Sequence, residues 1–138
     1  MRGYVHHIDL SVTDLSRSRP FYEVVLGFMG YVVGEEYGDG GTDYDLRAPA
    51  GFCSVGIRVS QGPHAARAHD RYAPGLHHLA WAAEDRAAVD ALHALLLRIG
   101  ATVLDAPADY PQYGAGYYAV FFADPDGLKL EYVFKPEG

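Results

Sequence analysis

Two stretches of the chain share one pattern of polar and apolar positions. Residues 6–14 and 77–85 each begin with a His-His pair, continue with alternating apolar positions and end at an aspartate, at a constant offset of 71. A period of two predicts a strand with one face packed against a core. The apolar side chains that share that face are Ile8, Leu10 and Val12 in the first stretch, and Leu79 and Trp81 in the second. Each half of the chain is therefore expected to begin with a half-buried strand.

The same succession of elements follows each of these strands. Helix-like stretches cover residues 15–26 and 86–99 and end at Gly27 and Gly100, the residue type favoured just past a helix end. Because proline disturbs a helix interior, we expect the firm part of the first helix to begin at Pro20. Further strands are expected at residues 30–33, 42–47 and 52–59 in the first half, and at 101–104, 117–123 and 128–134 in the second. The recurrence of these features in order indicates an internal repeat.

The repeat predicts an α+β fold built from two βαβββ modules. The modules are expected at about residues 1–59 and 76–138, with residues 60–75 as the linker between them, and the whole chain of 138 residues is expected to form one domain. Asp124-Pro125-Asp126-Gly127 carries the residue preferences of a type I turn and predicts a tight hairpin before the last strand.

Composition narrows the classes of function. The formal net charge is −7, and no cluster of Lys or Arg is present, which argues against nucleic-acid binding. No apolar run approaches the roughly 20 residues needed to span a bilayer, so no membrane role is expected. The N-terminus lacks a signal-peptide pattern, and the single cysteine, Cys53, excludes an internal disulfide. We therefore expect a cytoplasmic protein with a small-molecule substrate.

Three chemically suited side chains share the faces opposite the helices. His7 and His78 have the same phase in the two repeated strands, and Glu131 is the acidic residue within the last strand. A buried carboxylate requires a partner, and two imidazoles plus one carboxylate form a common ligand set for a divalent ion. The pattern therefore predicts a metal site of His7, His78 and Glu131. A register slip of one residue would instead select His6 and His77, which otherwise fall on the helix side.

The chain resembles the vicinal oxygen chelate superfamily, also called the glyoxalase, bleomycin-resistance and extradiol-dioxygenase group. The segments that carry the resemblance are residues 7–15, 20–27, 78–81 and 124–131. It implies two βαβββ modules curved around a metal cleft, with His7, His78 and Glu131 as ligands of one Fe, Zn, Ni or Mn ion. It also implies chelation of two neighbouring substrate oxygens, an enzyme of lyase, isomerase or dioxygenase type, and a homodimer. The alternative is a non-catalytic small-molecule binding protein of the bleomycin-resistance type.

The chain departs from the pattern of some relatives. Glyoxalase I enzymes usually carry a fourth ligand, Glu or Gln, on the last strand of the first module, but residues 53–58 contain neither. Extradiol dioxygenases usually carry a tyrosine ten residues before the last ligand, where this chain has Phe121. Antibiotic-binding members lack the metal ligands, whereas this chain keeps all three. The resemblance is therefore more specific for the fold than for the reaction.

Several further side chains are candidates for roles in the site. Asp9 shares a strand face with His7 and is a candidate proton acceptor. Arg58 is a candidate for binding an anionic substrate. Tyr113 lies in the glycine-rich segment 112–116, a possible lid, and is a candidate catalytic or substrate-contacting donor. The other candidates for substrate contact are Tyr118 and Phe121.

Overall fold

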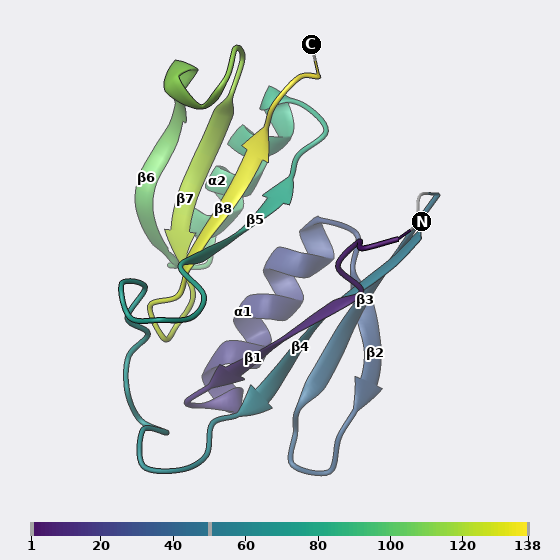
Figure 1. The fold of residues 1–138 in the computed structure, drawn as a ribbon, viewed down its shortest axis with the longest axis vertical. Coiled ribbons are helices and arrows are strands. Elements are labelled where there is room, and N and C mark those ends of the chain that lie inside the picture. The colour runs from purple at the N-terminus through teal and green to yellow at the C-terminus, as the bar shows by residue number, and fades with distance from the viewer. Residues whose placement is uncertain (1, 50, 138) are drawn as a thin grey trace. The chain divides into compact units, whose positions relative to one another are not determined.

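The computed structural model describes residues 2–49 and 51–137, and the chain divides into two compact units, Met1–Arg67 and Ala68–Gly138 (Figure 1). The first unit consists of β1 (His7–Val12), α1 (Leu15–Phe28), β2 (Val32–Glu36), β3 (Thr42–Ala48) and β4 (Gly51–Val59). The second consists of β5 (His78–Ala82), α2 (Arg86–Arg98), β6 (Thr102–Asp109), the 3₁₀ turn η1 (Pro111–Tyr113), β7 (Tyr118–Ala123) and β8 (Lys129–Phe134). Each unit therefore has the predicted βαβββ order.

The sheets of the two units have the same topology. The strand order is β1-β4-β3-β2 in the first unit and β5-β8-β7-β6 in the second. In each, the first strand pairs in parallel with the last, and the remaining neighbours pair antiparallel. The predicted α+β fold of two modules is confirmed.

An aspartate caps the N-terminus of each helix. The Asp14 carboxylate accepts a hydrogen bond from the Ser16 amide, and the Asp85 carboxylate accepts one from the Ala88 amide. Such caps satisfy amides that have no partner within the helix. Neither helix within the described residues has the length and apolar character needed to span a bilayer.

The first helix begins earlier than the sequence predicted. We expected its firm part to start at Pro20, but α1 runs unbroken from Leu15 and holds Pro20 in its interior. Proline removes one intrahelical hydrogen bond. The first turn is held instead by the Asp14 cap, whose backbone oxygen also accepts from the amides of Arg17 and Ser18. The cap therefore outweighs the local cost of the proline.

Each helix covers one face of its own sheet (Figure 1). The buried apolar side chains of the first unit are Leu10, Val12, Phe21, Tyr22, Val25, Leu26, Tyr31, Tyr44, Val55 and Ile57. The helix-side core of the second is built from Val89, Leu92, Leu96, Val120, Phe122, Leu128, Leu130 and Tyr132. Strand alternation then places the odd-numbered residues of β1, among them His7 and Asp9, on the opposite face, which the unit's own helix leaves uncovered.

The core of the second unit is testable with a matched pair of substitutions on α2. Leu92 is fully buried, whereas Leu97 on the same helix is 60% exposed. We expect Leu92→Ala to lower the free energy of unfolding by about 2–5 kcal/mol, because it removes buried methyl groups and leaves a cavity. We expect Leu97→Ala to change it by no more than about 0.5 kcal/mol. Trp81, the only tryptophan and a residue of β5, reports unfolding of this unit by its fluorescence in urea. Equal effects of the two substitutions would contradict the assigned packing of α2.

Candidate functional site

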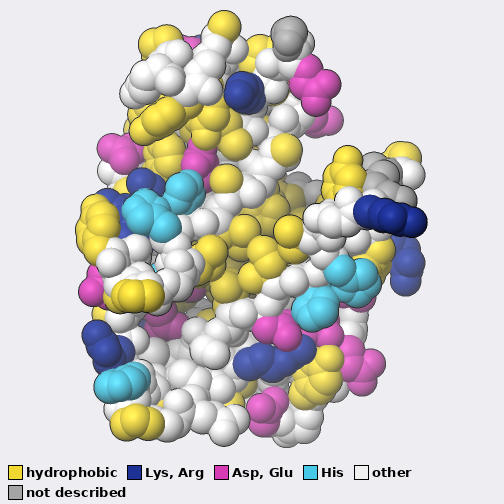
Figure 2. Space-filling model, viewed as in Figure 1, with side chains coloured by type: hydrophobic (Ala, Val, Ile, Leu, Met, Phe, Trp, Pro, Cys, Tyr) yellow, Lys and Arg dark blue, Asp and Glu magenta, His cyan; other side chains and the backbone are white. Residues whose placement is uncertain are grey.

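The two units present the same pair of histidines at the start of their first strands. His6 Nδ1 lies 3.0 Å from His7 Nδ1, and His77 Nδ1 lies 2.8 Å from His78 Nδ1. One nitrogen of each pair must donate and the other accept, so the contact fixes how the rings are turned. Exposed histidine side chains are visible at the surface in Figure 2. In both pairs the contact uses Nδ1 and leaves Nε2 of His7 and His78 for another partner.

In the second unit, His78 meets the carboxylate of Glu131. His78 Nε2 lies 3.2 Å from Glu131 Oε1, because β5 and β8 pair in parallel with Glu131 opposite Ala80, two residues after His78. Glu131 is only 2% exposed, although it is ionisable. Its other oxygen, Oε2, accepts a short hydrogen bond from the Tyr117 hydroxyl. Each oxygen of this buried carboxylate therefore has a named partner, as the cost of burying a charge requires.

An aromatic cluster surrounds Tyr117 on the same side of the sheet. The ring centroids of Tyr117 and Tyr113 are 5.4 Å apart, and Tyr110 stacks on Tyr113 at 5.8 Å. Tyr110 also meets Phe121 edge-on at 5.4 Å, and Phe121 lies directly opposite Glu131 in the β7–β8 register. Burial, together with the hydrogen bond to Glu131 and its charge, raises the pKa of Tyr117. Tyr117 consequently remains a neutral hydroxyl donor at physiological pH.

In the first unit, the corresponding face of the sheet is polar and hollowed. A cavity of about 610 Å³ is lined by His6, His7, Asp9, Gly34, Glu35, Tyr37, Asp43, Asp45, Phe52, Ser54 and Arg58. The lining includes four carboxylates and one guanidinium, so the local charge is negative when the carboxyl groups are ionised. A Cβ added at Gly34 would collide with the Asp45 carboxylate, so a glycine there makes room for that side chain.

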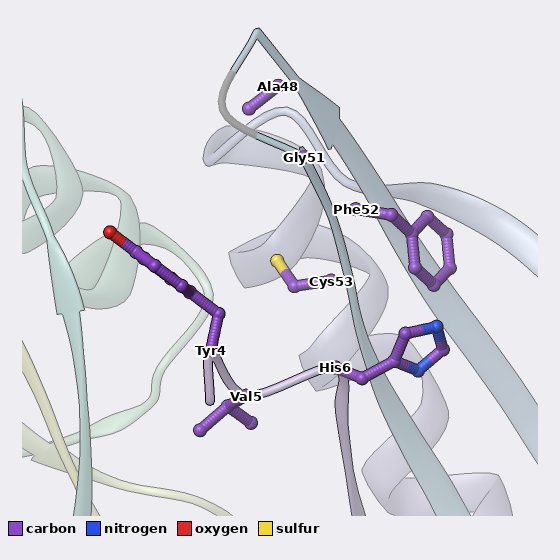
Figure 3. Close-up of a pocket in the computed structure, with 7 residues that line it drawn as sticks. All are labelled: Tyr4, Val5, His6, Ala48, Gly51, Phe52 and Cys53. Atoms are coloured by element: carbon purple, nitrogen blue, oxygen red, sulfur yellow. The ribbon is translucent and has the colours of Figure 1, made fainter. Parts of the chain in front are cut away.

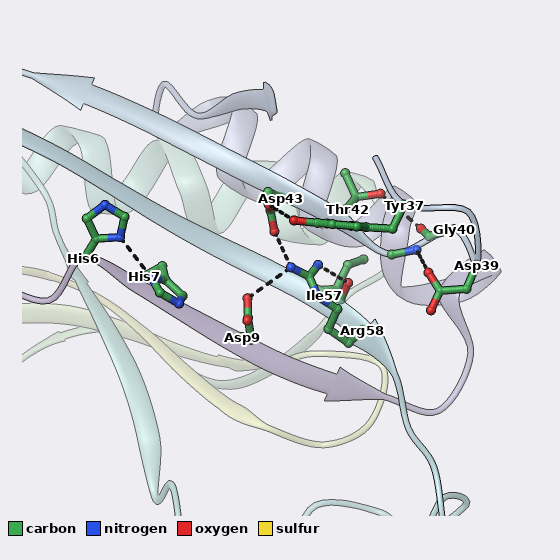
Figure 4. A network of polar contacts seen from close by, with 11 residues as sticks. His6, His7, Asp9, Tyr37, Asp39, Gly40, Thr42, Asp43, Ile57 and Arg58 are labelled. Carbon is green, nitrogen blue, oxygen red and sulfur yellow. Dashed lines mark hydrogen bonds and ion pairs between the residues drawn. The ribbon is translucent and has the colours of Figure 1, made fainter. Parts of the chain in front are cut away.

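Arg58 is the centre of a polar network within this cavity (Figure 4). Its guanidinium donates to Asp43 Oδ1 at 2.8 Å, lies 3.6 Å from Asp9 Oδ1 and stacks 4.2 Å from the Tyr37 ring centroid. The Tyr37 hydroxyl donates to the second oxygen of Asp43. Burial alone would raise the pKa of Asp43, but the hydrogen bonds from Tyr37 and Arg58 outweigh burial and lower it below 3.8. Two carboxylates already balance the Arg58 charge, which disfavours the expected binding of an anionic substrate.

A smaller cavity of about 370 Å³ lies at the other end of β4. It is lined by Tyr4, Val5, His6, Ala48, Gly51, Phe52 and Cys53 (Figure 3). His6 therefore borders each of these two cavities, and its ring lies 5.1 Å from that of Phe52. We expected His6 on the helix side, and that expectation is wrong. β1 begins only at His7, so strict alternation does not extend to His6.

The remaining predicted residues fall on different faces of the second unit. Phe121 and Tyr113 lie on the Glu131 side, and Tyr113 is 56% exposed. Tyr118 lies on the opposite side of β7, where its hydroxyl donates to Asp90 of α2 and Arg86 stacks over its ring. This placement removes Tyr118 from the substrate candidates. Tyr117 is the tyrosine that contacts Glu131. The sequence placed it next to the glycine-rich segment, at the start of the predicted strand 117–123, but it was not among the predicted site residues.

Comparisons with known proteins agree with the two-module fold. The sequence profile of the Glyoxalase/Bleomycin resistance protein/Dioxygenase superfamily matches residues 4–132. The chain belongs to this superfamily. It is 34% identical over 129 residues to the uncharacterized protein YqjT of Bacillus subtilis (strain 168), covering 94% of this chain and 97% of that protein.

Two solved structures of the glyoxalase group extend the comparison. One is a Bacillus halodurans protein provisionally named a glyoxalase, with a TM-score of 0.81 and 28% identity over 97% of both chains. The other is a lactoylglutathione lyase from Agrobacterium tumefaciens, with a TM-score of 0.66 and 19% identity over 96% of this chain and 93% of that one. At that identity the second likeness concerns the fold alone. Superfamily members typically bind a divalent metal and small-molecule substrates.

The strand registers locate the fourth-ligand position of the glyoxalase pattern in this chain. Glu131 lies opposite Ala80 in the second unit, and Gly56 lies opposite the corresponding Asp9 in the first. A Cβ added at Gly56 would lie 2.7 Å from Asp43 Oδ1 and would collide with Asp9 Oδ1. Neighbouring carboxylates thus fill the space of a side chain at this position. Among the described residues, no three His, Cys, Asp or Glu side chains gather as a metal site. Of the three predicted ligands, His78 and Glu131 contact each other within the second unit, and His7 belongs to the first.

The Arg58 network predicts an acid-dependent contribution to stability. Because the folded pKa of Asp43 is below its ordinary value of 3.8, the contribution is present above pH 3.8 and is lost as the pH falls through the folded pKa. We expect Arg58→Met to raise the Asp43 pKa, measured by carboxyl-carbon NMR titration, and to destabilise the protein more at neutral than at acidic pH. Arg47→Met, which removes a charge stacked over Phe52, is the matched control. An unchanged Asp43 titration in Arg58→Met would contradict the network.

Proposed function

We propose that this protein is a divalent-metal-dependent enzyme that acts on a small oxygenated molecule, of lyase, isomerase or dioxygenase type. In this proposal His7, His78 and Glu131 hold one Fe, Zn, Ni or Mn ion. The observation that carries the proposal is the approach of His78 Nε2 to 3.2 Å from the nearly inaccessible Glu131 carboxylate. Superfamily membership supports a metal-binding role for the same type of site.

The donor chemistry of His78 and Glu131 fits a divalent ion. A buried carboxylate needs a positive partner, and His78 provides one only while it is protonated. The contact between the Nδ1 atoms of His77 and His78 leaves Nε2 of His78 as an available donor atom. Imidazole nitrogen and carboxylate oxygen are ordinary ligands of zinc, iron, nickel and manganese. His7 is the proposed third ligand because its Nδ1 is engaged by His6 in the same way.

A bound ion would supply Lewis-acid stabilisation of negative charge on a substrate oxygen. The chain's own residues would bind the substrate and move protons. Asp9 lies on the His7 face with its side chain 45% exposed, so it remains the candidate proton acceptor. Phe121 and Tyr113 offer an aromatic surface on the Glu131 side. The four carboxylates that line the larger cavity favour a neutral or cationic substrate over an anionic one.

The rival class is a non-catalytic protein of the bleomycin-resistance type that binds a small molecule. The aromatic cluster around Tyr110 would serve such a protein equally well. The two classes differ in whether their function depends on the ion.

We also propose a cytoplasmic homodimer, in line with the frequent dimerisation of the superfamily.

Metal titration tests the proposal directly. We expect the wild-type protein, stripped with chelator, to bind one Zn²⁺ per chain in competition with a chromophoric chelator. We expect His7→Ala, His78→Ala and Glu131→Gln each to weaken Zn²⁺ binding by at least about 100-fold. Loss of a group that only hydrogen-bonds to a ligand usually weakens metal binding less than this. His64→Ala, which removes an exposed histidine from the irregular segment after β4, is the control and should bind as the wild type does.

The outcomes separate the two classes. Binding that survives in all three ligand variants would refute the ligand set. A wild-type protein that takes up no Zn²⁺, Fe²⁺, Ni²⁺ or Mn²⁺ and yet binds aromatic compounds would favour the non-catalytic class.

A further inference from the structure

The Glu131 carboxylate has two oxygens with different surroundings. Oε1 lies 3.2 Å from His78 Nε2, whereas Oε2 accepts the hydrogen bond from Tyr117. Because the side chain is only 3% exposed, water has little access to either oxygen. A carboxylate held at one oxygen cannot rotate freely, so the position of the other oxygen is fixed as well. The Tyr117 bond therefore determines which oxygen faces His78.

The position of Tyr117 is itself held from several directions. Its amide donates to the Gly114 carbonyl, and its own carbonyl accepts from the Tyr110 amide. The rings of Tyr110 and Tyr113 contact its ring edge-on at 6.3 Å and 5.4 Å. These contacts define both the backbone and the ring plane, and they point the hydroxyl at Glu131.

The strand opposite Glu131 offers no substitute for this hydroxyl. The register partner of Glu131 on β7 is Phe121, whose ring has no hydrogen-bonding group. On the other side, Ala80 of β5 is equally apolar. Tyr117, just before β7, therefore supplies the donor that these two register partners lack.

We propose that Tyr117 is a positioning residue that holds Glu131 Oε2 so that Oε1 is presented, together with His78 Nε2, to the divalent ion. This inference rests on the proposed function. Partners of metal-ligating carboxylates typically contribute about 10–100-fold to metal affinity. The role is one of orientation, and Tyr117 itself is not a ligand.

The test compares the Zn²⁺ affinity of chelator-stripped wild type, Tyr117→Phe and Tyr110→Phe by competition with a chromophoric chelator. We expect Tyr117→Phe to weaken Zn²⁺ binding about 10–100-fold, because the ring stays and only the hydroxyl is lost. Tyr110→Phe removes a hydroxyl from another ring of the cluster and should change affinity by less than about threefold. The urea midpoint of each apo variant, followed by Trp81 fluorescence, separates a loss of affinity from a loss of folding.

The results distinguish this inference from the proposed function. Equal Zn²⁺ affinity of wild type and Tyr117→Phe would overturn the positioning role alone, whereas absence of Zn²⁺ binding in the wild type would overturn both. If Tyr117→Phe does not fold, wild-type NMR decides the matter. A slowly exchanging Tyr117 hydroxyl proton that shows a cross-peak to Glu131 and persists with bound Zn²⁺ supports the role, and loss of that proton on Zn²⁺ addition refutes it.

Discussion

Parallel pairing of the first and last strands is the constraint on which the rest of each unit depends. The pairing of β5 with β8 places Glu131 beside Ala80 and within reach of His78, although 53 residues separate His78 from Glu131 in the chain. A parallel connection needs a crossover, and here the helix and two further strands supply it. The same helix and strands also bury the apolar face of the sheet. One connection therefore both builds the core of each unit and brings polar side chains of its first and last strands close together.

The two units use this scaffold for different chemistry. Where the second unit has Ala80, Glu131 and Phe121 in register, the first has Asp9, Gly56 and Asp43. In the second unit the buried Glu131 carboxylate lies beside the aromatic cluster of Tyr117, Tyr110 and Phe121. In the first, the carboxylates of Asp9 and Asp43 share the space beside Gly56 and both face the single positive charge of Arg58. The shared positions are the histidine pairs, and they are also the positions that carried the repeat in the sequence.

The sequence predicted those parts of the structure that depend on local periodicity. The order of elements and the helix-side faces of β1 and β8 follow from alternation and from the glycines at the helix ends. It failed where one local rule competed with another or where a loop was involved. The helix α1 begins at Leu15, after the Asp14 cap, although Pro20 lies in its interior. His6 precedes β1, so the alternation of that strand does not predict which way its side chain points. Phe121 and Tyr118 are three residues apart on β7, so they lie on opposite faces. With Phe121 on the Glu131 side, Tyr118 faces α2.

Tyr117 lies just before β7, at the first position of the strand predicted for residues 117–123, and alternation from Phe121 places it on the Glu131 side. Alternation does not show, however, that its hydroxyl reaches the carboxylate. What directs its hydroxyl is a set of contacts with Tyr110 and Tyr113, and these depend on how the loop after β6 folds back. A buried carboxylate nevertheless demands a donor for each oxygen. Phe121 and Ala80, the register partners of Glu131, are apolar and offer no side-chain donor, and the donor to Oε2 is the Tyr117 hydroxyl. The requirement for hydrogen-bond satisfaction thus adds Tyr117 to the site, which the pattern of candidate ligands alone did not do.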